Sequence, residues 1–302
     1  MKFRSVSRVL PTVEVLEGEG FLARRPFPVG DIHQLDPFIQ LDEFGPASPG
    51  PGEAKGAPDH PHRGIETVTY ILEGEIVHRD DSGYSATTGP GCVQWLTAGD
   101  GVIHSEFPSE PILTQGGRVH GFQLWINLPS RFKRVEPRIQ EFCGNDLPVV
   151  QDEESGLHIR VIAGSCLGVT GPVITWTPLL FTHLTLEGNC ELDLPVTSDW
   201  QCVFYAFRGT GKAGTWKVSR GELVQWNHNG ELIRLKAGEE GLEGLLFAGE
   251  MLSEPFLRHG PFVMNHPGEI YEAIRDYRNG CFGKGRPVAN GQPMVPNPAN
   301  YR

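Results

Sequence analysis

Two short segments of the sequence place metal-binding side chains at alternate positions. His60 and His62 lie in the segment DHPHRG, and His104 and Glu106 lie in the segment GVIHSE. Residues i and i+2 of an extended chain point to the same side, so each pair forms a two-pronged clamp that can face a common centre. Four such ligands around a six-coordinate transition-metal ion leave two positions open. The spacing therefore predicts one metal site with room for a further molecule.

Other polar motifs suggest less reactive roles. Glu66 is the one serious additional candidate ligand. The adjacent Asp42 and Glu43 could mimic an acid–base dyad, but neighbouring residues of a strand diverge, so we expect a solvated or loop-anchoring role. No helical HExxH zinc motif and no GxSxG nucleophile motif occur. Eight histidines have no ligand-spaced partner and are expected to be surface or satisfied core residues: His33, His78, His120, His158, His183, His228, His259 and His266.

The composition favours a folded chain of short strands. Of 302 residues, 38 are glycine and 25 are proline, a content that suits turn-linked strands better than long helices. The net charge of −11 disfavours direct binding to nucleic acid. Neither a signal peptide nor a long apolar run is recognisable, so we expect a cytoplasmic protein without a membrane role, with a nuclear pool if the source is eukaryotic. The six cysteines form no CxxC pair and are predicted to be buried free thiols.

A weak internal repeat indicates two copies of one β-unit. Residues 69–74 resemble residues 204–209, and Val-Gln-Trp at 93–95 recurs at 224–226. Short, turn-bounded strands suggest a sandwich or a small barrel in each copy.

A polar connector between the copies places the domain boundary near Pro137. The predicted domains are therefore 1–136 and 137–283, followed by an extended or disordered tail at 284–302. One helix is expected after a cap at Asn265, with Pro267 in its first turn and Gly280 at its end.

The two clamps resemble the paired metal-binding motifs of the cupin superfamily, and longer phrases are similar to the pirin family. The matching phrases are residues 35–38, 41–45, 58–68, 94–99, 104–106 and 259–265. The resemblance covers about residues 1–283 and implies an all-β bicupin, with two tandem antiparallel β-barrels and a short C-terminal helix. It also implies an iron ion in the N-terminal barrel with His60, His62, His104 and Glu106 as ligands.

The sequence departs from the general cupin pattern at one position. Counting back from Gly74, the place of the usual first-motif glutamate falls on Thr67, and Glu66 would point to the other face of its strand. We therefore expect the carboxylate ligand to be Glu106, with Glu66 binding only if the strand slips by one residue. In the second copy, the repeat offsets place weak or non-coordinating residues at the ligand positions, which predicts a metal-free barrel: Pro195, Thr197, Leu235 and Ala237.

The resemblance implies two classes of function. One is an iron(II)-dependent dioxygenase that cleaves quercetin-type flavonols with O2, with Glu106 as the catalytic base. Manganese, nickel, copper or zinc would also suit the donor set. The alternative is a redox-sensing regulator that acts on protein partners as a transcription cofactor, without turnover. The open coordination positions and the negative charge favour the enzyme, whose substrate could also be something other than a flavonol.

Overall fold

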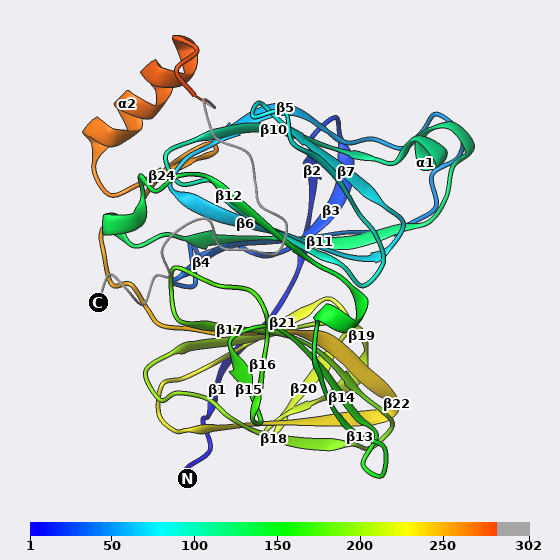
Figure 1. Ribbon diagram of the computed structural model, residues 1–302. Coiled ribbons are helices and arrows are strands. Elements are labelled where there is room, and N and C mark those ends of the chain that lie inside the picture. The colour runs from blue at the N-terminus through cyan, green and yellow to red at the C-terminus, as the bar shows by residue number, and fades with distance from the viewer. Residues whose placement is uncertain (283–302) are drawn as a thin grey trace. The chain divides into compact units, whose positions relative to one another are not determined.

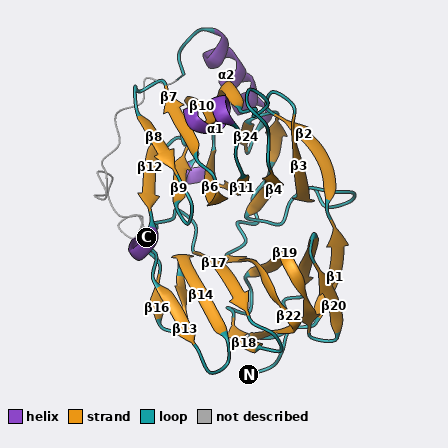
Figure 2. Cartoon of the chain, turned by 90° about the vertical axis from the view of Figure 1, so that its right-hand side faces the viewer, coloured by secondary structure: helices purple, strands orange, loops and turns teal. Residues whose placement is uncertain are grey.

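The computed structural model describes residues 1–282, and almost all of its regular structure is strand (Figures 1 and 2). Contacts between residues divide the chain into two compact units. Among the described residues, unit A contains 14–25, 38–144 and 252–282, and unit B contains 1–13, 26–37 and 145–251. The expected all-β fold with two cupin domains is confirmed, whereas the boundary near Pro137 stays a prediction.

Unit A consists of a seven-stranded and a four-stranded antiparallel sheet (Figure 1). In spatial order, the large sheet contains β12 (Arg138–Phe142), β9 (Val93–Thr97), β6 (Ile65–Glu73), β11 (Val119–Asn127), β4 (Phe38–Ala47), β3 (Phe21–Phe27) and β2 (Val13–Glu17). The small sheet contains β5 (Ala57–His62), β10 (Val102–Pro108), β7 (Ile76–Asp80) and β8 (Ser85–Thr88). Both histidine segments therefore lie in the small sheet, on neighbouring strands.

Unit B contains one nine-stranded antiparallel sheet and a separate two-stranded sheet. Its main path contains β1 (Val6–Pro11), β21 (Glu222–Trp226), β19 (Gln201–Ala213), β22 (Leu232–Gly249), β17 (Leu179–Leu186), β14 (Leu157–Ala163) and β13 (Val149–Asp152). Two further strands join this sheet, β18 (Glu191–Pro195) beside β22 and β20 (Trp216–Ser219) beside β19, while β15 (Ser165–Cys166) and β16 (Val169–Thr170) pair only with each other. The repeat is visible in the pairing, because β6 pairs with β9 as β19 pairs with β21. Residues 209–214 have the GxGxxG spacing of dinucleotide-binding loops, but they run along β19 into a hairpin with β20 and precede no helix.

Two α-helices and two 3-10 helices interrupt the strands. These are α1 (Glu110–Gln115), η1 (Ser130–Phe132), η2 (Gly144–Asp146) and α2 (Pro267–Arg278). The predicted cap at Asn265 is wrong by one residue: His266 is the N-cap, since its backbone is extended directly before the helix and its N–H donates to Glu269 in a capping box. Ile270 and Ala273 of α2 pack on the hairpin of β23 (Leu257–His259) and β24 (Phe262–Met264).

Within residues 1–282, the structure contains no helix of the length and apolar character needed to cross a membrane. The tail expected at 284–302 lies outside the described residues.

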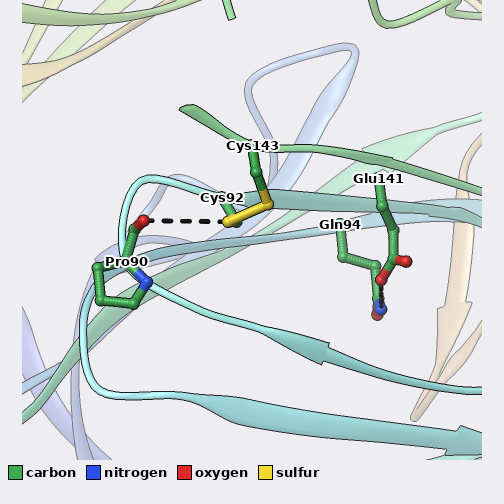
Figure 3. The surroundings of a disulfide bond; sticks show 5 residues. All are labelled: Pro90, Cys92, Gln94, Glu141 and Cys143. Atoms are coloured by element: carbon green, nitrogen blue, oxygen red, sulfur yellow. Dashed lines mark hydrogen bonds between the residues drawn. A yellow bond between two sulfur atoms is a disulfide. The ribbon is translucent and has the colours of Figure 1, made fainter. Parts of the chain in front are cut away.

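The prediction of six free thiols is wrong for one pair. Cys92 and Cys143 form a disulfide, with Cα atoms 4.2 Å apart (Figure 3). Since Val93 of β9 lies opposite Phe142 of β12, the two cysteines face each other across the ends of these strands. The 51-residue separation hid this cross-strand pair from motif reasoning. The other four cysteines are free as predicted. Cys166, Cys190 and Cys202 are buried, but the prediction of burial is wrong for Cys281, which is exposed.

Replacement of Cys143 by Ser is expected to lower the free energy of unfolding by about 2–4 kcal/mol, because the disulfide closes a long loop and restricts the unfolded chain. Chemical denaturation under oxidising conditions measures this loss. Cys281→Ser is the matched control, since it removes an exposed thiol without a disulfide. Equal unfolding free energies for Cys143→Ser and the wild type would contradict the stabilising role.

Candidate metal centre

Three of the four predicted ligands meet inside unit A. His60 of β5 lies opposite His104 of β10 in the strand register, and His62 follows His60 on the same face of β5. One ring nitrogen from each histidine lies within 4.8 Å of the others. The ring centroids are 4.4 Å apart for His60 and His104, and 5.1 Å apart for His62 and His104. These three residues form a group that can hold a metal ion.

The residues that follow His62 fix the end of β5. Gly64 has a positive φ of 80°, and a Cβ atom there would lie 2.0 Å from the carbonyl oxygen of Val263. The buried Arg63 guanidinium donates to the Asp100 carbonyl oxygen at 2.5 Å and to the Asp276 carboxylate of α2 at 2.9 Å. The HRG segment therefore anchors the histidine strand to the helix and to the turn after β9.

The imidazoles are held in the form that binds metals. Burial, and to a smaller extent the neighbouring His60, lowers the pKa of His62 and of His104 well below 6.5, which favours the neutral form of both rings. His60 Nδ1 lies 2.8 Å from the Pro58 carbonyl oxygen, which can only accept, so the proton is on Nδ1 and Nε2 is free. His104 Nε2 is buried and has no hydrogen-bond partner, the environment expected for a ligand atom.

Glu106 lies near the histidines but does not join their group. Its carboxylate accepts hydrogen bonds from Thr69 Oγ1 at 2.8 Å and Gln123 Nε2 at 2.6 Å. An irregularity in the pairing with β5 separates His104 from Glu106, since Glu106 lies opposite Ala57. The alternation of side chains along β10 correctly predicted that His104 and Glu106 lie on the same face. The hydrogen bonds of Glu106 to other strands could not be predicted from sequence spacing.

Glu66 lies on the opposite face of β6 from Thr69, as the register argument requires. Its carboxylate is fully buried and accepts a hydrogen bond from Thr97 Oγ1 at 2.8 Å. Glu66 is not part of the histidine group. The alternative in which Glu66 binds the same ion has no support in this geometry.

The expectation of a solvated or loop-anchoring Asp42–Glu43 pair is wrong, because both side chains are buried in β4. They do diverge: Asp42 accepts two hydrogen bonds from Arg25, each 2.7 Å long, whereas Glu43 lies 2.8 Å from His120 Nε2. Although burial raises the pKa of the Asp42 carboxyl, the bidentate arginine compensates for the charge. Asp42 therefore contributes to the wall of the site as half of an ion pair.

A cavity of about 820 Å³ opens onto the histidines, within the size range of small-molecule sites. Both His60 and His62 line it, and so does Glu106. Its apolar lining includes Phe21, Leu22, Phe44, Ile76, Val119 and Trp125. The cavity can therefore enclose an apolar molecule whose polar edge reaches the histidines.

A row of polar side chains crosses the inner face of the large sheet beneath this cavity. Its members lie opposite one another on consecutive strands, which places their side chains on one face: Glu141, Gln94, Thr69, Gln123 and Asp42. Gln123 also accepts from Trp125 Nε1 at 3.4 Å, which fixes the orientation of its amide. Thr69 and Gln123 of this row hold Glu106, and these two residues and Asp42 supply hydrogen-bonding groups to the cavity.

Sequence reasoning missed the residues that support the ligands. His78 was expected to be an ordinary core or surface histidine, yet its Nδ1 atom lies 3.3 Å from His104 Nδ1. Thr69 and Gln123 drew no attention because threonine and glutamine occur throughout β-strands. The sequence does contain one indication of their role: Thr69 and Gln123 are polar residues in strands whose other residues are mostly apolar and buried.

We expect one metal ion per chain, because the interior of unit B is apolar. Leu235 and Ala237, the counterparts of His104 and Glu106, lie in its hydrophobic core, and Pro195 and Thr197 are exposed. Elemental analysis of the full chain, with anomalous scattering to locate the ion, tests this stoichiometry. A second well-occupied ion within residues 140–250 would contradict it.

Comparison with known proteins adds to this geometry. The pirin family model matches residues 20–126, and the model of the pirin C-terminal cupin domain matches residues 181–283. Pirin-1 of Arabidopsis thaliana is 40% identical over 280 residues, covering 91% of this chain and 92% of its own. Human pirin is 37% identical, with 88% and 89% covered. The crystal structure of a quercetin 2,3-dioxygenase from Acinetobacter baumannii superposes with a TM-score of 0.88 at 34% identity, covering 93% of this chain and 99% of that one.

Proposed function

The chain belongs to the pirin family, and we propose that it is an iron(II)-dependent dioxygenase that cleaves quercetin-type flavonols with O2. The observation that carries this proposal is the meeting of three imidazoles, two of them buried, beside a largely apolar cavity that His60 and His62 line. The similarity to the Acinetobacter enzyme supports the same activity.

The donor set fits a first-row divalent ion. His60 and His104 each direct a free Nε2 atom to the centre, since their Nδ1 atoms are engaged elsewhere. We propose His60, His62, His104 and Glu106 as the ligands. Manganese, nickel, copper and zinc suit the same donors, and we favour iron(II) because the resemblance to pirins implies it. A bound iron(II) ion would chelate a hydroxy-ketone substrate and activate it toward O2.

The chain's own residues bind the substrate and remove its proton. The aromatic walls of the cavity, including Phe44 and Trp125, bury planar rings and exclude water. Glu106 takes the proton of the substrate hydroxyl, because its carboxylate lines the cavity next to the histidines. Thr69 and Gln123 hold that carboxylate in place.

Oxygen uptake with a flavonol tests the proposal. Iron-loaded protein should consume O2 only when quercetin or a related 3-hydroxyflavone is present, and chelated protein should not. A flat trace across a panel of flavonols, on fully metallated protein, would favour the regulatory alternative. That alternative predicts instead that the oxidation state of the ion changes the affinity for a protein partner.

A further inference from the structure

A second histidine and an aspartate lie behind the metal-facing histidine of β10. In the pairing of β10 with β7, Asp80 lies opposite His104 and His78 lies opposite Glu106, so all four side chains share a face. His78 Nδ1 lies 3.3 Å from His104 Nδ1, and His78 Nε2 lies 3.3 Å from Asp80 Oδ2. The two histidine rings are almost fully buried. The three side chains thus form one chain of hydrogen bonds that ends at a proposed ligand.

Asp80 is the acceptor at the end of this series of hydrogen bonds, and the turn after β7 fixes its carboxylate. Asp80 Oδ1 accepts from the backbone N–H of Ser82 at 3.0 Å, from Ser82 Oγ at 2.6 Å and from the backbone N–H of Tyr84 at 3.1 Å. Backbone N–H groups can only donate, so this carboxylate is an acceptor held in one orientation. The other oxygen, Oδ2, therefore accepts the proton of His78 Nε2.

The tautomer of each ring follows from that acceptor. A neutral His78 whose proton is on Nε2 can only accept at Nδ1, so His104 Nδ1 donates to it. His104 then carries its proton on Nδ1 and presents the lone pair of Nε2, the buried atom that has no hydrogen-bond partner. We infer that Asp80 and His78 are positioning residues that fix His104 in its metal-binding tautomer. This inference rests on the proposed role of His104 as a ligand.

Asp80→Asn should reverse the direction of both hydrogen bonds that link residue 80, His78 and His104. The amide oxygen must take the place of Oδ1, because two backbone N–H groups donate there, and the NH2 group then faces His78 Nε2. His78 would have to accept at Nε2 and donate from Nδ1, which moves the His104 proton onto Nε2. We expect metal affinity to fall by about 10- to 100-fold. Asp81→Asn is the matched control, since it removes the same charge from an exposed neighbour whose carboxylate accepts from the Ile103 backbone N–H.

Long-range ¹H–¹⁵N correlation spectra of the metal-free, histidine-labelled full chain report the tautomers directly. In the wild type, His78 should be protonated on Nε2 and His104 on Nδ1; in Asp80→Asn, both assignments should reverse. The opposite tautomers in the wild type would overturn the inference, whatever the variants do. Unchanged tautomers in folded Asp80→Asn would overturn it as well.

A double-variant cycle separates this role from a structural one. His78→Phe removes the hydrogen bond to His104 Nδ1, so either neutral tautomer of His104 can form. The loss of metal affinity in His78→Phe should therefore be smaller than in Asp80→Asn. Adding His78→Phe to Asp80→Asn should restore affinity to the level of His78→Phe alone. Additive losses would show that Asp80 only supports the fold. Full metal binding by His104→Ala would instead overturn the ligand assignment on which the inference rests.

Discussion

Replacement of His62 or His104 by Ala is expected to remove most of the bound metal ion. Each substitution deletes a buried ring whose nitrogen lies within 4.8 Å of the two others. Since loss of a supporting residue alone lowers metal affinity by about 10- to 100-fold, loss of a direct ligand should exceed about 100-fold. Competition with a chromophoric chelator measures the change.

The control for this loss is His228→Ala, which removes an exposed histidine of unit B. It should leave metal content unchanged. Melting temperatures of the metal-free proteins show whether a variant has merely lost its fold. Stoichiometric metal in folded His62→Ala and His104→Ala would disprove the assignment of these ligands.

Glu106→Gln is expected to retain the fold and the ion but to lower kcat for flavonol-dependent O2 uptake by about 10²- to 10⁴-fold. Glutamine keeps the shape and an oxygen donor but cannot take up the substrate proton. The surroundings can accept the amide: its oxygen can receive the Gln123 donor, and the Thr69 hydroxyl can rotate to accept from its NH2 group. Steady-state oxygen-electrode traces on equally metallated proteins give kcat.

Glu141→Gln is the matched control, because Glu141 lies in the same polar row and accepts from Gln94 and Tyr84 rather than facing the proposed ligands. It should leave kcat near the wild-type value. Full activity in Glu106→Gln would show that Glu106 is not the base. Loss of the ion together with activity would assign Glu106 to metal binding alone.

The strand pattern was sufficient to predict the histidine group. His60 and His62 share a face because β5 is extended, and the pairing of β5 with β10 then brings His104 opposite His60. Both facts follow from local periodicity and from a short antiparallel pairing. The same periodicity correctly separated Glu66 from the site, because a one-residue shift moves a side chain to the other face.

Contacts between distant strands could not be predicted in this way. The position of the Glu106 carboxylate depends on Thr69 and Gln123, two unremarkable residues of the large sheet. The Cys92–Cys143 disulfide depends on the register of β9 with β12, across 51 residues of chain. His78 lacks any ligand-spaced partner in sequence, and its role arises from a diagonal contact with His104 across two strands.

The most direct test of the proposed function is product analysis after reaction of the iron-loaded protein with quercetin under ¹⁸O₂. A dioxygenase places both atoms of one O2 molecule in its products, so we predict that two ¹⁸O atoms appear in the cleaved flavonol products for each quercetin consumed. The chelated protein and Glu106→Gln should give little labelled product. Intact quercetin after incubation with fully metallated protein, or O2 consumed without label in any organic product, would contradict the proposed function.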